Sequence, residues 1–175
     1  LDGWFYEFEV TNDKGKIRCL DPYAKSMAAF LNDGTSGRGA IINPENSKYL
    51  PQGGWSSTDK SEICETLPEF SDYSQAIVYE ISVRDFTISP DSGVKNTKGT
   101  YKSFIEKLPY LKDLGVTHIQ LLPVVNFYHT DETNKKYEGN GTAANNNYNW
   151  GYDPHNYFTP EGWYASDATN PYSRV

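Results

Sequence analysis

The sequence is poor in cysteine and in long apolar runs. Its two cysteines, Cys19 and Cys64, lie far apart and match no metal-binding spacing, which favours two thiols without a metal over a thiolate metal centre. No apolar run approaches the length of a membrane-spanning helix, and the N-terminus lacks the basic, apolar and small-residue order of a signal peptide. The chain also begins at Leu1 without a methionine, and we expect a segment of a longer protein with no membrane insertion.

Basic residues are scarce, whereas aromatic residues are abundant. The 16 Lys and Arg against 23 Asp and Glu give a net charge of −7 and a pI near 4.9, which argues against a polyanionic partner such as nucleic acid. Aromatic residues make up 15% of the chain, with 14 tyrosines. They fit either a tyrosine-rich core or a glycan-binding surface, and composition leaves both interpretations open.

The N-terminal part has the pattern of an antiparallel hairpin. Alternating apolar positions predict a half-buried strand over 4–10, the cluster 12–15 is typical of a turn, and 16–20 reads as the return strand. A single hairpin is not stable alone, so we expect it to belong to a β-sandwich with further strands upstream. From 21 to about 74 the chain is rich in Gly, Pro, Ser and Asn, which indicates a long connector lying on a neighbouring surface.

The second half has the pattern of a parallel βαβ unit. Residues 77–83 are strand-like, 103–114 carry apolar residues at helical spacing, and 116–124 form a nearly continuous apolar strand. The continuous run predicts a strand that is buried on both faces of a parallel sheet. Such a strand–helix–strand connection is expected to be right-handed.

The helix expected in this unit carries signals at both ends. Ser103 and Glu106 have the spacing of a capping box, and Gly115 stands where a C-terminal glycine belongs. Pro109 disagrees with an uninterrupted helix, because proline lacks the backbone N–H that an interior position needs. We therefore expect either a kink or an irregular first turn.

The densest mixture of aromatic and polar side chains is the run Tyr148-Asn149-Trp150-Gly151-Tyr152-Asp153-Pro154. Rings with flat apolar faces and polar rims suit the faces of a pyranose. This run resembles the signature of the type I pullulanases, the α-1,6-glucan debranching enzymes of glycoside hydrolase family 13. Other stretches that resemble the family are 21–26, 37–40, 79–86, 111–124, 156–158 and 160–164.

The resemblance implies an α/β fold in two parts. Residues 1–75 would be the C-terminal part of an N-terminal β-sandwich module of glycan-binding type, together with its connector. Residues 76–175 would be the first β/α units of a catalytic (β/α)₈ TIM barrel, incomplete as given. Active sites of such barrels lie at the C-terminal ends of the strands, where the loop over 126–160 is expected.

The resemblance also assigns substrate-binding roles to five residues of the motif. Tyr152 is expected to stack on the glucose that is cleaved, and Asp153 to bond its hydroxyls or hold the loop. Trp150 would stack or buttress, Asn149 would bond a hydroxyl, and Tyr148 would support the others from behind. The competing interpretation is that Trp150 and Tyr148 simply form the core of the loop.

Neighbouring polar residues have structural interpretations. Arg84 and Asp85, at the end of the first strand, are expected to pair with each other or with neighbouring residues, and His155 is expected to support the motif. Asp131 and Glu132 carry the oxygen ligands that Ca²⁺ prefers. No ligand spacing supports a calcium site, so we expect a solvated acidic loop there and no required cofactor.

Retaining glycoside hydrolysis needs two carboxyl groups about 5 Å apart. The family resemblance places them after the fourth and fifth barrel strands, and no Asp or Glu of this chain matches them. We therefore expect no catalytic residue here and an inactive isolated chain, whose partners are an α-glucan (pullulan, starch or glycogen) and the remaining part of its own polypeptide. A non-catalytic α-glucan-binding fragment, an isoamylase and a branching enzyme are the alternatives. A secreted or cell-surface location is expected, and a cytoplasmic one stays open.

Overall fold

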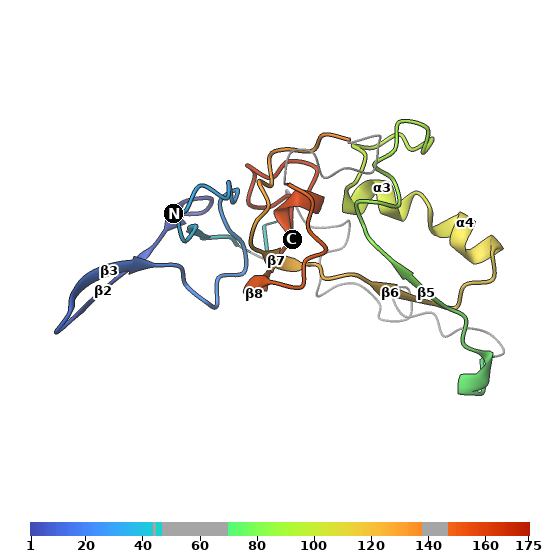
Figure 1. Ribbon diagram of the computed structural model, residues 1–175, viewed down its shortest axis with the longest axis horizontal. Helices are drawn as coiled ribbons and strands as arrows, with labels where there is room; N and C mark the ends of the chain where they lie inside the picture. Colours follow the sequence, from blue (N-terminus) through green and yellow to red (C-terminus); the bar gives the residue numbers. More distant parts are fainter. Residues whose placement is uncertain (44, 47–69, 138–146) are drawn as a thin grey trace.

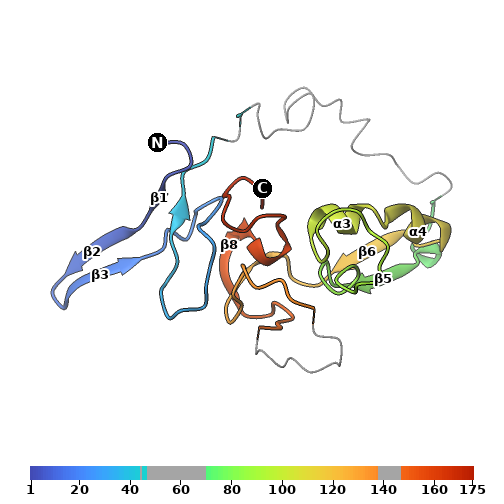
Figure 2. The same cartoon turned by 90° about the horizontal axis from the view of Figure 1, so that it is seen from above.

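The computed structural model describes residues 1–43, 45–46, 70–137 and 147–175. The molecule is elongated, and the described strands pair into four two-stranded sheets. Figures 1 and 2 show a hairpin projecting at one end, a strand pair with two helices at the other, and a further strand pair between them. In the described part of the chain, no helix is long and apolar enough to cross a membrane.

The predicted N-terminal hairpin is confirmed. β2 (Phe8–Asn12) pairs antiparallel with β3 (Gly15–Cys19), with Phe8 opposite Cys19 and Asn12 opposite Gly15. Gly15 has a φ of 122°, and the Asn12 side chain accepts a hydrogen bond from the backbone N–H of Lys14 at 2.9 Å. The prediction of a half-buried strand is wrong, because all five residues of β2 are exposed on a ribbon that projects from the rest (Figure 1).

The strand expected over 4–10 is divided between two partners. β1 (Phe5–Tyr6) pairs antiparallel with β4 (Gly39–Ala40), whereas β2 continues into the hairpin. Gly39 suits this contact, since a Cβ there would lie 2.8 Å from the Tyr6 ring. β1 therefore pairs with a strand of the connector and not with the return strand β3.

The first part of the connector lies on the C-terminal segment, as expected. Met27 and Phe30 are buried, the Ser26 hydroxyl donates to the Pro171 carbonyl at 2.6 Å, and the Thr159 hydroxyl donates to the Ala24 carbonyl at 2.6 Å. These contacts join residues more than 130 positions apart. The remainder of the connector, with Cys64, lies largely outside the described residues.

The predicted strand–helix–strand order is confirmed. The elements are η1 (Tyr73–Gln75), β5 (Val78–Ile81), α3 (Tyr101–Ile105), α4 (Leu108–Asp113) and β6 (His118–Leu121). β5 and β6 are parallel, with Val78 opposite His118 and Ile81 opposite Leu121. The two helices cover one face of this pair (Figures 1 and 2).

The helix begins earlier than predicted and is interrupted. Thr100 is the N-cap of α3, with Ser103 as its capping-box partner, so the pairing of Ser103 with Glu106 is wrong. The Glu106 carboxylate instead accepts the backbone N–H groups of Lys95 and Asn96, each at 2.8 Å. Pro109 falls in the first turn of α4, where no intrahelical N–H is needed, and this resolves the expected irregularity as a break.

The predicted burial of the second strand is also wrong. All four residues of β6 are exposed, with Leu121 at 40%, although the run is apolar. In the described residues the sheet contains only β5 and β6, and the helices pack on one of its faces. The opposite face is therefore exposed. The apolar residues of β6 are therefore not buried on both faces, as their sequence pattern predicts.

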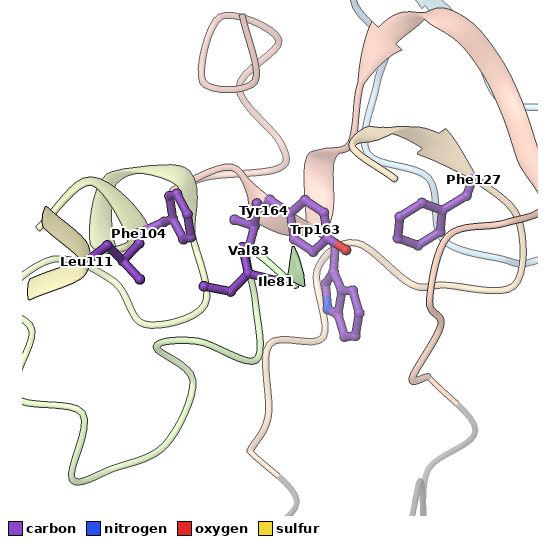
Figure 3. Packing of buried hydrophobic residues seen from close by; sticks show 7 residues of the cluster. All are labelled: Ile81, Val83, Phe104, Leu111, Phe127, Trp163 and Tyr164. Atoms are coloured by element: carbon purple, nitrogen blue, oxygen red, sulfur yellow. The ribbon is translucent and has the colours of Figure 1, made fainter. Parts of the chain in front are cut away.

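The core joins the two strand pairs of the second half. β7 (Val125–Phe127) pairs antiparallel with β8 (Pro154–Pro160), and η2 (Gly162–Tyr164) follows. Figure 3 shows Trp163 and Tyr164 between Phe127 on one side and the side chains of the β5–α4 unit on the other. The loop between β7 and β8 is thereby anchored to the parallel strand pair.

Candidate functional site

The aromatic loop directly precedes β8 and presents two rings to solvent. Trp150 is 62% exposed and Tyr152 is 65% exposed, whereas Gly151 between them is buried. Two large exposed aromatic side chains within three residues provide flat apolar surface for a ligand. The two rings stand on a backbone that the rest of the loop holds in place.

Asn149 and Gly151 fix the backbone of this loop. The Asn149 amide donates to the Tyr128 carbonyl at 2.7 Å and to an Asp153 carboxylate oxygen at 2.9 Å, and its oxygen accepts the Gly151 N–H at 2.8 Å. Both amide protons of Asn149 are therefore used inside the loop. Gly151 has a φ of 89°, and a Cβ there would lie 2.8 Å from the Phe127 ring, so only glycine fits.

Asp153 is held at the end of the loop with part of its carboxylate accessible. Its backbone carbonyl accepts the Tyr128 N–H at 3.1 Å, and one carboxylate oxygen accepts from Asn149. The other oxygen lies 3.9 Å from the His129 ring nitrogen, and 35% of the side chain is exposed. This second oxygen is a partly accessible acceptor in the same loop as the exposed rings.

Tyr148 is less exposed than Trp150 and Tyr152, at 38%, and is tied to the segment that follows β5. Its hydroxyl donates to Asp85, four residues beyond the end of β5, and its ring meets that of Trp163 edge-on, with the ring centres 6.4 Å apart. Burial, followed by the hydrogen bond to Asp85, raises the pKa of Tyr148 well above its usual value. The predicted Arg84–Asp85 pair is confirmed at 2.9 Å, and the Arg84 guanidinium lies 4.6 Å from the centre of the Trp163 ring.

The structure also contains a buried charge cluster that the sequence did not predict. Glu132 and Arg174 form an ion pair of 2.6 Å, and both side chains are fully buried. Glu132 also accepts the backbone N–H groups of Phe30 at 2.8 Å and Gly162 at 3.0 Å. The expectation of a solvated acidic loop is therefore wrong for Glu132, which joins three segments distant in sequence.

Glu161 is a second buried carboxylate of this cluster. It accepts the N–H groups of Trp163 at 2.7 Å and Phe127 at 3.1 Å. Burial, followed by the charge of Glu132, raises the pKa of Glu161 well above its usual value. Both carboxylates are enclosed and cannot reach a ligand on the loop. Among the residues that the structure describes, no group of three or more His, Cys, Asp and Glu is arranged for a metal ion.

The loop thus presents exposed aromatic rings beside a partly accessible carboxylate. No family model matches the chain. It is 40% identical to pullulanase A of Streptococcus pneumoniae over 99% of its own length and 13% of that protein, and 32% identical to the pullulanase of Bacillus subtilis over 99% and 22%. The crystal structure of a Group B Streptococcus pullulanase is similar at a TM-score of 0.81, with 39% identity, covering 97% of this chain and 22% of that one. Along almost its whole length, the chain is homologous to pullulanases.

Two further structures and one further relative bear on the ligand. The Group B Streptococcus pullulanase in complex with maltotetraose matches at a TM-score of 0.79 and 39% identity, over 97% of this chain and 21% of that one. A product complex of a multi-modular glycogen-degrading pneumococcal virulence factor matches at 0.78 and 38%, over 97% and 17%. The isoamylase of a Flavobacterium species is 31% identical over 86% of this chain and 19% of that protein. The chain thus spans less than a quarter of each of these proteins.

Proposed function

We propose that the chain is part of a debranching glycoside hydrolase that cleaves α-1,6-glucosidic bonds in pullulan, starch or glycogen. The observation that carries this proposal is the pair of exposed rings, Trp150 and Tyr152, on a backbone locked by Asn149 and Gly151. The homology to pullulanases supports the reaction, and the maltotetraose complex of one relative supports an α-glucan ligand.

The proposed fold of the whole protein places this chain at a domain junction. Residues 1–75 would close a β-sandwich module and its connector, and 76–175 would begin a (β/α)₈ barrel. The parallel pairing of β5 with β6 and the helices between them support the barrel assignment. The exposed apolar face of β6 supports it too, since further barrel strands would cover it.

Each residue of the loop receives a proposed role from its surroundings. Tyr152 stacks on the glucose that is cleaved, and Trp150 extends the apolar platform. Asp153 bonds a sugar hydroxyl through the oxygen that Asn149 leaves open. Asn149 acts mainly by holding the loop, because both of its amide protons are used there. Tyr148 supports the platform through Asp85.

The catalytic carboxylates lie, on this proposal, in the remaining part of the polypeptide. The retaining mechanism needs a nucleophile and an acid/base that both reach the sugar. Glu132 and Glu161 are buried in the charge cluster and serve the fold. The isolated chain is therefore inactive, and no cofactor is required for the proposed chemistry. Fractionation of cells would test the proposed secreted or cell-surface location, against a cytoplasmic one.

The test uses the full-length protein with pullulan and with maltotetraose. We expect Tyr152→Ala to weaken maltotetraose binding by about tenfold to a hundredfold, the loss of one stacking platform. The matched control is Tyr73→Ala, because Tyr73 is 93% exposed on η1, outside the loop. Equal binding by the two variants would contradict the assignment of the loop. Isoamylase activity is the second candidate, favoured by the Flavobacterium relative, and a protein that debranches glycogen but leaves pullulan intact would establish it.

A further inference from the structure

His155 occupies an irregular position at the base of the loop. In the β7–β8 pair Phe127 lies opposite Pro154, and Asn126 lies opposite Asn156. One step along β7 thus corresponds to two steps along β8, which makes His155 the extra residue of a β-bulge. Bulges turn a side chain away from the regular alternation of a strand and occur often beside functional sites.

The bulge directs His155 onto a buried amide whose orientation is fixed. Asn126 is fully buried, and its amide nitrogen lies 3.0 Å from an oxygen of Glu132 and 3.4 Å from an oxygen of Glu161. The Glu132 carboxylate, which is ion-paired with Arg174, only accepts hydrogen bonds, so the NH₂ group of Asn126 must face it. The Asn126 oxygen therefore faces His155, whose Nδ1 lies 2.7 Å away and must carry the proton.

The His155 ring also supports the residue that holds the loop. Its centre lies 4.3 Å from that of the Tyr128 ring and 4.7 Å from that of the Phe30 ring. Tyr128 bonds the loop at two points, since its N–H donates to the Asp153 carbonyl and its carbonyl accepts from Asn149. A continuous path of contacts thus runs from the buried charge cluster through His155 to the backbone of the loop.

We propose that His155 is a positioning residue that holds the 148–153 loop in its binding geometry, through the Nδ1–H bond to Asn126 and the ring contact with Tyr128. This role rests on the proposed function of the loop. His155 is half-buried among Phe30, Tyr128 and Asn126, so we assign it to the support of the loop and not to contact with the glucan. Burial lowers the pKa of His155, and a hydrogen bond with the Ser36 backbone and the charge of Glu132 act in the opposite direction.

Two substitutions separate the hydrogen bond from the ring. His155→Phe keeps an aromatic ring against Phe30 and Tyr128 and removes the donor, which leaves the Asn126 oxygen buried without its bond. His155→Asn loses the ring and keeps an N–H group near the position of Nδ1. Tyr157→Phe is the control on the same strand, because Tyr157 is exposed on β8.

The experiment measures maltotetraose binding by calorimetry and pullulan kinetics for each full-length variant. We expect His155→Phe and His155→Asn each to raise the Kd and KM about tenfold while kcat changes less than about twofold, because each variant removes one of the two contacts. Wild-type binding by His155→Phe would overturn the proposal. So would wild-type binding by His155→Asn, which decides alone if His155→Phe does not fold. A wild-type protein that neither binds maltotetraose nor cleaves pullulan would refute the proposed function instead.

Discussion

Replacement of Gly151 by alanine should damage the loop in two separable ways. The residue has a φ of 89°, a conformation that costs an L-residue about 1–2 kcal/mol. The new Cβ would also lie 2.8 and 2.9 Å from two carbons of the buried Phe127 ring and 3.0 Å from Pro123. Overpacking of this kind costs about 1–3 kcal/mol. The two effects together amount to about 2–5 kcal/mol.

Gly93 offers a control that isolates the backbone effect. It has a similar φ of 72°, and nothing lies within 4 Å of the Cβ that a substitution would add. Gly93→Ala should therefore cost only the conformational part, about 1–2 kcal/mol. The difference between the two variants measures the clash with Phe127 and Pro123 alone.

The assay combines thermal unfolding of the full-length variants with calorimetric binding of maltotetraose. If the loop stays in place, the clash lowers the unfolding temperature. If the loop moves away from Phe127, the clash is relieved and the affinity for maltotetraose falls. Gly151→Ala should thus be worse than Gly93→Ala in at least one of the two measurements. If both variants unfold at the same temperature and bind maltotetraose equally, the packing of Gly151 on Phe127 does not set the loop geometry.

Two further predictions concern the buried polar groups. Arg174→Met leaves the Glu132 carboxylate buried without its cation and should lower the free energy of unfolding by about 3–5 kcal/mol. Lys16→Met removes the exposed 2.8 Å pair with Glu9 and should lower it by about 1 kcal/mol or less. Equal losses in unfolding temperature for the two variants would contradict this account. His155 has a lowered pKa in the folded state, so it stabilises the fold above its unfolded pKa of 6.5, and this contribution is lost as the pH falls below that value towards the lower folded pKa. His155→Phe should therefore show a smaller drop in unfolding temperature between pH 7 and pH 5 than the wild type, and an identical drop would refute the assignment.

Short-range signals predicted the local elements well. The Asn12–Gly15 turn and its hairpin follow from residues within the turn itself, and the parallel strand pair follows from two apolar runs around a helix. The helix start was misplaced because Thr100 and Ser103 are both capping residues, three positions apart. Glu106 was assigned to the cap, although its carboxylate is taken by Lys95 and Asn96, about ten residues upstream.

Long-range contacts account for what the sequence did not predict. The burial of Glu132 depends on Arg174, 42 residues away, and on the Phe30 N–H, 102 residues away. No local pattern around Asp131-Glu132 marks such partners. The position of His155 depends on a bulge opposite Asn126, and an isolated histidine after the motif predicts only that it lies nearby. The exposed rings of the loop, in contrast, were prominent in the sequence because the whole segment is contiguous.

The central claim is that the 148–153 loop binds an α-glucan in an enzyme that cleaves α-1,6-glucosidic bonds. The most direct measurement is product analysis after incubation of pullulan with the full-length protein, wild type and Tyr152→Ala. The account predicts maltotriose as the product of the wild type and a strongly reduced yield with Tyr152→Ala at low pullulan concentration. Intact pullulan after incubation with the wild type, or equal maltotriose from both proteins, would contradict it.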